Sequence, residues 1–289
     1  LREAVPLARS RAERGRLRIG LAWLEHQAGR SDLAEAEARA GLADLGDAAG
    51  CGEGWFVLGS IARHRDRPDE ARDAWRRALA HAGAGPDAPG LSRARLHLNL
   101  AQVEDALGDA DAARPHYLAA QRAAREDGDA RSEAVALGNL AHAALAAGRP
   151  READVLIGRA VTLAAALGDR QLDGYLADGV ARVRLAFGEA GTARGWAARA
   201  VEIGHEVGDA ALRVEGLATL AEALRATGDE GGARTLAAAA ERLARRVGYG
   251  PGLRRLRDAA TRGVTPASRR NGQAGPGREV DHGEGAEVP

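Results

Sequence analysis

The sequence of 289 residues contains 41 basic and 41 acidic residues, so its formal net charge is zero, and only 3% of its residues are aromatic. Balanced charge argues against a general attraction to nucleic acid or to an anionic membrane. A core limited largely to Leu, Ala and Val favours close-packed helices over a β-sandwich. The single Cys51 excludes an internal disulfide and a multi-cysteine metal site.

Residues 1–11 are interpreted as the remnant of a preceding segment. The chain does not begin with methionine, and we predict that Leu1 is a cut or processed end. The first ten residues lack the apolar core of a signal peptide, and no stretch of about 18 uninterrupted apolar residues indicates a transmembrane span. The expected location is therefore cytoplasmic, without membrane association.

From residue 12 to residue 248 the chain carries a repeat whose clearest copies are 40 residues long. Two sets of glycines mark this repeat. The first set is Gly108, Gly148, Gly188 and Gly228. The second set is Gly128, Gly168 and Gly208, and an Asp follows each of its members. Six units are predicted at 12–50, 51–90, 91–129, 130–169, 170–209 and 210–248, with a longer turn at 83–90. A capping helix is predicted at 249–261 and a disordered tail, rich in Gly, Pro and charge, at 262–289.

Each segment between two glycines has the length and periodicity of an amphipathic helix. Glycine closes a helix in the left-handed conformation, and an Asp behind it can cap the next helix. Alanines in a fixed register, such as Ala141 and Ala181, fall where two helices must approach closely. We therefore predict an all-α fold: an α-solenoid of about six helical hairpins in a right-handed superhelix, in which each hairpin buries its apolar face against its neighbours.

Unit two carries a family pattern of small and aromatic residues, which comprises Trp55, Leu58, Gly59, Ala71, Trp75 and Ala78. This pattern resembles the tetratricopeptide repeat (TPR), with Ala62 where the family usually has tyrosine and Trp75 where it usually has phenylalanine. The resemblance spans residues 12–248, and Arg184 occupies the tyrosine slot of unit five.

The period of 40 residues exceeds the TPR period of about 34 and overlaps the range of armadillo-type repeats, but the small-residue frame favours TPR-like units with longer helices. The sequence also resembles the long-helix arrays of actinobacterial regulators of the LuxR and SARP/AfsR types. In those regulators the arrays adjoin ATPase and DNA-binding modules.

No motif in the sequence predicts catalysis, a cofactor or a metal. His205 begins an H-E-x-x-H pattern, but Asp209 stands where the second histidine is required. Segment 83–88 fits a loose G-x-G-x-x-A pattern without the strand that a dinucleotide site requires. The chain has no lysine, so it has no P-loop, and its tail has no helix-turn-helix pattern. Because no site supports an enzyme, we predict a non-catalytic protein without cofactor, metal or direct nucleic-acid binding.

The TPR resemblance implies that the first helices of successive units line a concave groove that binds a protein or peptide. The side chains that it places on this groove are Trp23, His26, Phe56, Ser60, Arg63, Leu98, Gln102, Asp105, His142, Leu145, Tyr175, Asp178, Arg182, Glu222 and Arg225. Aromatic and arginine side chains are typical interface anchors, and the mixture suits an amphipathic peptide or helix. The alternative for each residue is an ordinary packed or solvated side chain.

The predicted function is therefore that of a cytoplasmic scaffold or adaptor that binds a peptide or partner domain. The alternative is the C-terminal sensor or coupling region of a larger transcriptional regulator of the ATPase, SARP or LuxR type. Binding to chaperone C-termini through a carboxylate clamp is disfavoured, because Asn99 and Asn139 are available but the lysines of that clamp are absent.

Overall fold

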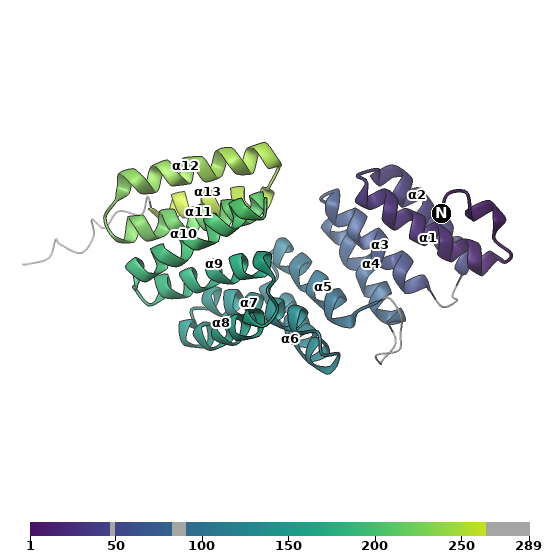
Figure 1. Ribbon diagram of the computed structural model, residues 1–289, viewed down its shortest axis with the longest axis horizontal. Coiled ribbons are helices and arrows are strands. Elements are labelled where there is room, and N and C mark those ends of the chain that lie inside the picture. Colours follow the sequence, from purple (N-terminus) through teal and green to yellow (C-terminus); the bar gives the residue numbers. More distant parts are fainter. Residues whose placement is uncertain (47–49, 83–90, 264–289) are drawn as a thin grey trace, which may run out of the picture.

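The computed structural model describes residues 1–46, 50–82 and 91–263, which are helical apart from caps and short turns (Figure 1). A 3-10 helix, η1 (Val5–Leu7), precedes the α-helices. These are α1 (Arg11–Gln27), α2 (Ser31–Leu45), α3 (Cys51–His64), α4 (Pro68–His81), α5 (Arg93–Leu107), α6 (Ala110–Glu126), α7 (Ala130–Ala146), α8 (Pro150–Ala165), α9 (Arg170–Ala186), α10 (Ala190–Glu206), α11 (Ala210–Ala226), α12 (Glu230–Val247) and α13 (Gly250–Gly263). No strand occurs within the three described ranges, and the all-α prediction is confirmed.

The helices pair in chain order. Each odd-numbered helix from α1 to α11 packs against the even-numbered helix that follows it, and each pair then packs against the next. In Figure 1 the first four helices lie at one side of the molecule and α9 to α13 at the other; α5 and α6 lie between them, and α7 and α8 lie below α9. Because the pairs in the described part of the chain pack mainly against their neighbours in sequence, the architecture is that of a helical-repeat solenoid.

The glycines and aspartates of the repeat end and begin the helices as predicted. The backbone φ of Gly128, Gly148 and Gly168 is +69°, +69° and +63°, the left-handed region that closes a helix at low steric cost in glycine. The aspartates after the second glycine set each accept a hydrogen bond from the backbone N–H three residues later, at 2.9, 3.0 and 2.9 Å for Asp129, Asp169 and Asp209. These caps satisfy N–H groups that have no partner inside the helix.

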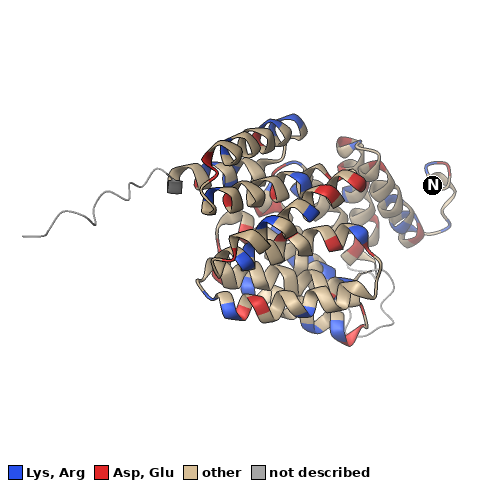
Figure 2. Cartoon of the chain, turned by 60° about the vertical axis from the view of Figure 1, so that its left-hand side comes forward, with Lys and Arg blue, Asp and Glu red and all other residues tan. Residues whose placement is uncertain are grey.

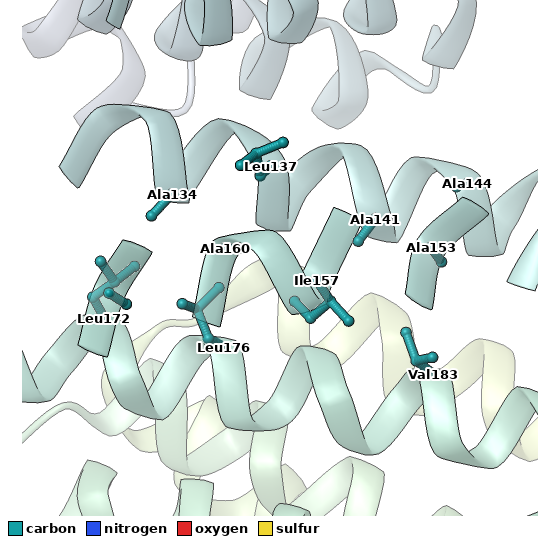
Figure 3. Packing of buried hydrophobic residues seen from close by; sticks show 11 residues of the cluster. Ala134, Leu137, Ala141, Ala144, Ala153, Ile157, Ala160, Leu172, Leu176 and Val183 are labelled. Atoms are coloured by element: carbon teal, nitrogen blue, oxygen red, sulfur yellow. The ribbon is translucent and has the colours of Figure 1, made fainter. Parts of the chain in front are cut away.

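The repeated alanines lie at the closest contacts of the core. Ala141, Ala153 and Ala160 have no exposed surface. Figure 3 shows Ala141 and Ala153 among the side chains that fill the space between α7, α8 and α9, with Ile157 and Leu176 nearby. A methyl group at these positions allows the helix axes to approach, and larger side chains from the other positions fill the remaining volume.

Replacing Ala141 by leucine is expected to lower the free energy of unfolding by about 2 kcal/mol, because the added atoms have no space between α7 and α8. The control is Ala146→Leu at an exposed position near the end of the same helix, where the expected change is within about 0.5 kcal/mol. Urea unfolding followed by circular dichroism measures both. Equal stability of the two variants would contradict the proposed packing.

Arg184 fills the tyrosine slot of unit five without burying its charge. Its guanidinium pairs with Asp154, lies 3.4 Å from the Glu189 carboxylate and stands 5.6 Å from the ring centre of Phe187. The side chain is 25% exposed. The aliphatic stem thus occupies the slot while the charged end reaches surface carboxylates.

One predicted segment lies wholly, and another partly, outside the described residues. The longer turn predicted at 83–90 and the part of the predicted tail from residue 264 onward lie outside the described residues. The region predicted as a capping helix is α13, which packs against α12 and α11.

Candidate protein-interaction surface

The predicted groove residues stand on odd-numbered helices, and these helices form a layer of their own. Direct contacts join α1 to α3, α5 to α7, α7 to α9, α9 to α11 and α11 to α13. Between α3 and α5, side chains make the contact, through Arg63 with Gln102 and Arg95 with Phe56. We call the side of the odd-numbered helices that carries the predicted groove residues the inner face.

The N-terminal half of the inner face carries a run of aromatic and basic side chains from three helices. The ring centre of Trp23 lies 5.9 Å from that of His26 and 6.0 Å from that of Phe56. His26 in turn lies 5.7 Å from His64, and the guanidinium of Arg95 stands 5.6 Å from the ring centre of Phe56. We call this set the aromatic–basic strip; it comprises Trp23, His26, Phe56, Ser60, Arg63, His64 and Arg95.

The strip is accessible, and its arginines lack acidic partners. Arg63 and Arg95 are exposed, and Trp23 and Phe56 are half-buried. Neither arginine forms an ion pair with any residue that the structure describes: Arg63 donates to Gln102 Oε1 at 3.4 Å and stands 6.0 Å from the Trp75 ring. Partial burial lowers the pKa of Arg63. No carboxylate within the described ranges opposes this shift.

His26 adds an unused polar atom to the strip. Its Nδ1 atom is buried and has no hydrogen-bond partner among the described residues. Burial lowers the pKa of His26, and the neighbouring His64 and Arg63 lower it further. The ring is thus kept neutral near pH 7 and can either donate or accept a hydrogen bond.

The three predicted groove residues of α5 have different environments. Leu98 is only 8% exposed and packs in the core with Tyr117 and Leu140, so it does not stand on the accessible surface that the prediction requires. Gln102 is half-buried and accepts from Arg63. Asp105 is exposed but accepts a hydrogen bond of 2.6 Å from the Tyr117 hydroxyl on α6.

The C-terminal half of the inner face is occupied by its own ion pairs. Asp178 is 2% exposed; its carboxylate lies 2.7 Å from Arg182 Nε and accepts a hydrogen bond of 2.5 Å from Thr219 Oγ1. The same Arg182 donates to Glu215 Oε2 at 2.5 Å. Burial acts to raise the pKa of Asp178, but Arg182 and Arg255 outweigh it and hold the pKa below its usual range.

Helix α13 completes this arrangement with one arginine. The Arg255 guanidinium donates to Glu215 Oε2 at 2.7 Å, to Thr219 Oγ1 at 2.8 Å and to Glu222 Oε1 at 3.1 Å. Burial acts to lower the pKa of Arg255, but the carboxylates of Asp178, Glu222 and Glu215 raise it overall. We call these side chains the α9–α13 ion cluster; it comprises Asp178, Arg182, Glu215, Thr219, Glu222 and Arg255.

Besides the three residues of α5, four predicted groove residues lie outside both sets. The Tyr175 hydroxyl donates to Asp209 Oδ2 at 3.0 Å, and Arg225 lies 3.8 Å from Glu230. Leu145 is half-buried against the core. Burial, with a contribution from the charge of Arg182, lowers the pKa of His142 to about 4, and its Nε2 has no hydrogen-bond partner among the described residues.

Sequence reasoning missed five residues of these two sets: His64, Arg95, Glu215, Thr219 and Arg255. Strict use of the repeat would have found most of them. Glu215 and Arg255 follow Tyr175 at successive intervals of 40 residues, and Arg95 precedes Tyr175 by two such intervals. Because positions one period apart occupy equivalent places on successive hairpins, this register indicates inner-face residues better than the local choice of aromatic and charged side chains does.

A histidine pair lies between α5 and α6. The Nδ1 atoms of His97 and His116 are 3.0 Å apart, so one ring must donate and the other accept. Burial, then the charges of His116, Arg93 and Arg122, lowers the pKa of His97 to about 4, and burial also lowers the pKa of His116. Protonation of both rings would place two donors against each other.

Because of this pair, we expect the folded protein to lose stability in acid. In the unfolded chain a histidine titrates near pH 6.5, so the unfolded state binds protons first as the pH falls. The contribution of this pair to the free energy of unfolding is therefore fully present above about pH 6.5 and is lost as the pH falls toward 4. With solvent screening of these partly exposed rings, the expected loss is on the order of 1 kcal/mol. Urea unfolding at several pH values should give a smaller decline in His97→Gln than in the wild type; equal declines would exclude the pair as its source.

Comparison with known proteins gives the fold class. No family model matches the sequence, and no curated protein matches it. The structure is similar to PilF of Pseudomonas aeruginosa, with a TM-score of 0.57 and 17% identity over 87% of this chain and 99% of that one. It is also similar to BtubC (BKLC) of P. vanneervenii, with a TM-score of 0.55 and 19% identity over 90% and 99% of the two chains.

A third similar structure is a Rap protein complexed with Competence and Sporulation Factor, with a TM-score of 0.56 and 15% identity over 87% of this chain and 75% of that one. These neighbours are TPR-like repeat proteins. The fold is TPR-like. At such low identity the similarity establishes the fold alone, so any function must be argued from this chain's own surface.

Three further features of the described residues concern metal sites, membrane-spanning helices and the distribution of charge. Within the described ranges, no group of three or more His, Cys, Asp or Glu side chains is arranged to hold a metal ion. None of the helices described is long and apolar enough to cross a membrane. Figure 2 shows that basic and acidic residues alternate along the helices rather than gathering on one side.

Proposed function

We propose that this protein is a non-catalytic TPR-like interaction module that binds a peptide or a partner domain on its inner face. The aromatic–basic strip carries this proposal. It presents half-buried rings and unpaired arginines on three helices, and such side chains are the usual anchors of protein interfaces. The Rap structure complexed with Competence and Sporulation Factor gives independent support, because a protein of similar fold there holds a partner.

The proposal revises the extent of the predicted groove. Asp178, Arg182 and Glu222 satisfy one another or bind Arg255 of α13, so a partner gains little by replacing these contacts. We therefore place binding on α1, α3 and α5. We further propose that the protein uses no cofactor and no metal and that it is located in the cytoplasm.

A photo-cross-linking amino acid placed at Ser60 tests this function. Ser60 lies within the strip, and its hydroxyl donates to the carbonyl of Phe56 on its own helix, at 3.0 Å. The matched control is Val155, which is 65% exposed on α8. Irradiation in cells of the source organism should yield a discrete cross-linked product at position 60 and none at position 155. No product at position 60, or the same product at both, would contradict inner-face binding.

The second proposal is that the chain is the sensor or coupling region of a larger transcriptional regulator. Its support is the 40-residue period of long helical hairpins, which resembles the arrays of LuxR-type and SARP/AfsR-type regulators. Sequencing of the gene upstream of the Leu1 codon tests it. An open reading frame that encodes ATPase or DNA-binding motifs is expected, and an in-frame stop codon directly upstream would exclude the second proposal but leave the first unaffected.

A further inference from the structure

The chemistry of the aromatic–basic strip indicates which kind of segment it binds. Resting on the proposed function, we infer that the strip binds an acidic protein segment that carries an aromatic or aliphatic anchor: the anchor packs against Trp23 and Phe56, and flanking carboxylates pair with Arg63 and Arg95. The inference depends on the geometry of these four side chains and on the contrast between the two halves of the inner face.

The arginines of the two halves of the inner face differ in their acidic partners. Arg182 and Arg255 in the C-terminal half each contact two carboxylates. Arg63 and Arg95 contact none within the described ranges and instead face Gln102 and an aromatic ring. Asp105, three residues beyond Gln102, accepts from Tyr117 rather than from Arg63. The strip is therefore a positive region in a protein of zero net charge, and a partner carboxylate supplies the missing charge.

Phe56 joins the aromatic and the basic parts of the strip. The Phe56 ring contacts Trp23 on one helix and the Arg95 guanidinium on another. Arg63 lies two helical turns along α3 from Phe56, on the same side of that helix. An apolar side chain placed on the two rings therefore has Arg95 beside it and Arg63 about two helical turns away, which suits a segment in which acidic residues flank an apolar side chain. Aromatic anchors in such settings contribute most of the binding energy, and flanking charges determine orientation and selectivity.

Side chains of α3 and α5 meet within the strip. Arg63 of α3 donates to Gln102 of α5, and the guanidinium of Arg95 on α5 stands near the Phe56 ring of α3. An extended segment or a helix can contact both helices there at once.

The four tryptophans of the chain allow a direct test. Trp23 belongs to the strip, Trp75 is buried beneath Gly59, Trp55 stacks with Arg77 at 4.6 Å, and Trp196 lies on α10. In ¹⁵N-labelled full-length protein each indole N–H gives its own NMR signal. The probe is the acetylated, amidated peptide Glu-Asp-Leu-Phe-Glu-Asp, and its control is the uncharged peptide Gln-Asn-Leu-Phe-Gln-Asn.

With the acidic peptide, the Trp23 signal should shift and saturate while the Trp196 signal stays in place. The apparent Kd should be at least about tenfold lower than that of the uncharged peptide and should rise with salt, because the pairing is electrostatic and partly exposed. In Arg63→Gln/Arg95→Gln the preference for the acidic peptide should disappear. Arg194→Gln/Arg242→Gln removes the same charge from exposed positions on α10 and α12 and should retain the preference.

Three results would overturn the inference: no saturable Trp23 shift up to millimolar acidic peptide, equal affinity for the two peptides, or an unchanged preference in Arg63→Gln/Arg95→Gln. A dimer in light scattering that this double variant dissociates would also overturn it, because the occupant would then be a second copy of the chain. A cross-linked product at Ser60 together with equal peptide affinities would reject the acidic preference and retain the proposed function. Absence of that product would reject the proposed function itself.

Discussion

Replacing Arg182 by methionine is expected to lower the free energy of unfolding by about 3 kcal/mol. The substitution keeps the aliphatic stem but removes the ion pair to Asp178 at 2.7 Å and the hydrogen bond to Glu215 at 2.5 Å. Asp178 is 2% exposed and cannot recover its hydration, so its charge stays buried with weaker compensation. The loss therefore exceeds the value of about 1 kcal/mol or less that is usual for a surface salt bridge.

A double-mutant cycle with Asp178→Asn isolates this interaction. In Arg182→Met/Asp178→Asn the buried charge is absent, and part of the lost stability should return. Arg194→Met, at an exposed position on α10, is the control and should change stability by less than about 0.5 kcal/mol. Chemical unfolding at pH 7 measures the wild type, the two single variants, the double variant and the control. If Arg182→Met loses no more than the control, the α9–α13 ion cluster does not stabilise the C-terminal half as described.

Replacing Gly59 by alanine is expected to lower the free energy of unfolding by about 2 kcal/mol, although alanine favours a helix more than glycine does. A Cβ atom at this position would lie 2.5 Å from Cδ1 and 2.8 Å from Cε2 of Trp75. Trp75 has no exposed surface, and its indole N–H donates to the Phe56 carbonyl at 3.3 Å, so the ring cannot move aside without losing contacts.

The control for Gly59 has the opposite expected sign. Gly158 on α8 is also a helical glycine, but an added Cβ would meet nothing within 4 Å. Gly158→Ala should therefore raise stability by about 0.5 to 1 kcal/mol through helix propensity alone. Thermal and urea unfolding of both variants measure the difference. Stabilisation in both would show that Trp75 does not pack against α3 as closely as the structure indicates.

The fold could be predicted from sequence because its signals are local and repeated. A glycine such as Gly128 ends a helix through its own backbone conformation, and Asp129 caps the next helix through a bond to a residue three positions away. The alanine register extends the same logic to pairs of neighbouring helices. These features depend on residues that are close in the sequence, so the helical hairpins and their stacking could be predicted without knowledge of distant contacts.

The candidate site could be predicted only in part because it depends on contacts between units. Leu98 satisfies the inner-face periodicity, yet Tyr117 and Leu140 cover it. The ion pairs of the C-terminal half depend on Arg255, which donates to Glu215. Arg255 reaches the inner face because its helix, α13, packs against α11 and α12. Aromatic and charged residue types identified where a groove could lie, but only the structure distinguished paired from unpaired arginines.

Affinity of the natural partner for charge variants of the full-length protein tests the central claim most directly. Once the Ser60 cross-link has identified that partner, its Kd is measured for the wild type, for Arg63→Gln/Arg95→Gln and for Arg194→Gln/Arg242→Gln. Binding through the aromatic–basic strip predicts a Kd at least about tenfold higher for the first variant, corresponding to about 1.4 kcal/mol, and one within twofold of the wild type for the second. Equal affinities of all three proteins would contradict binding through the strip.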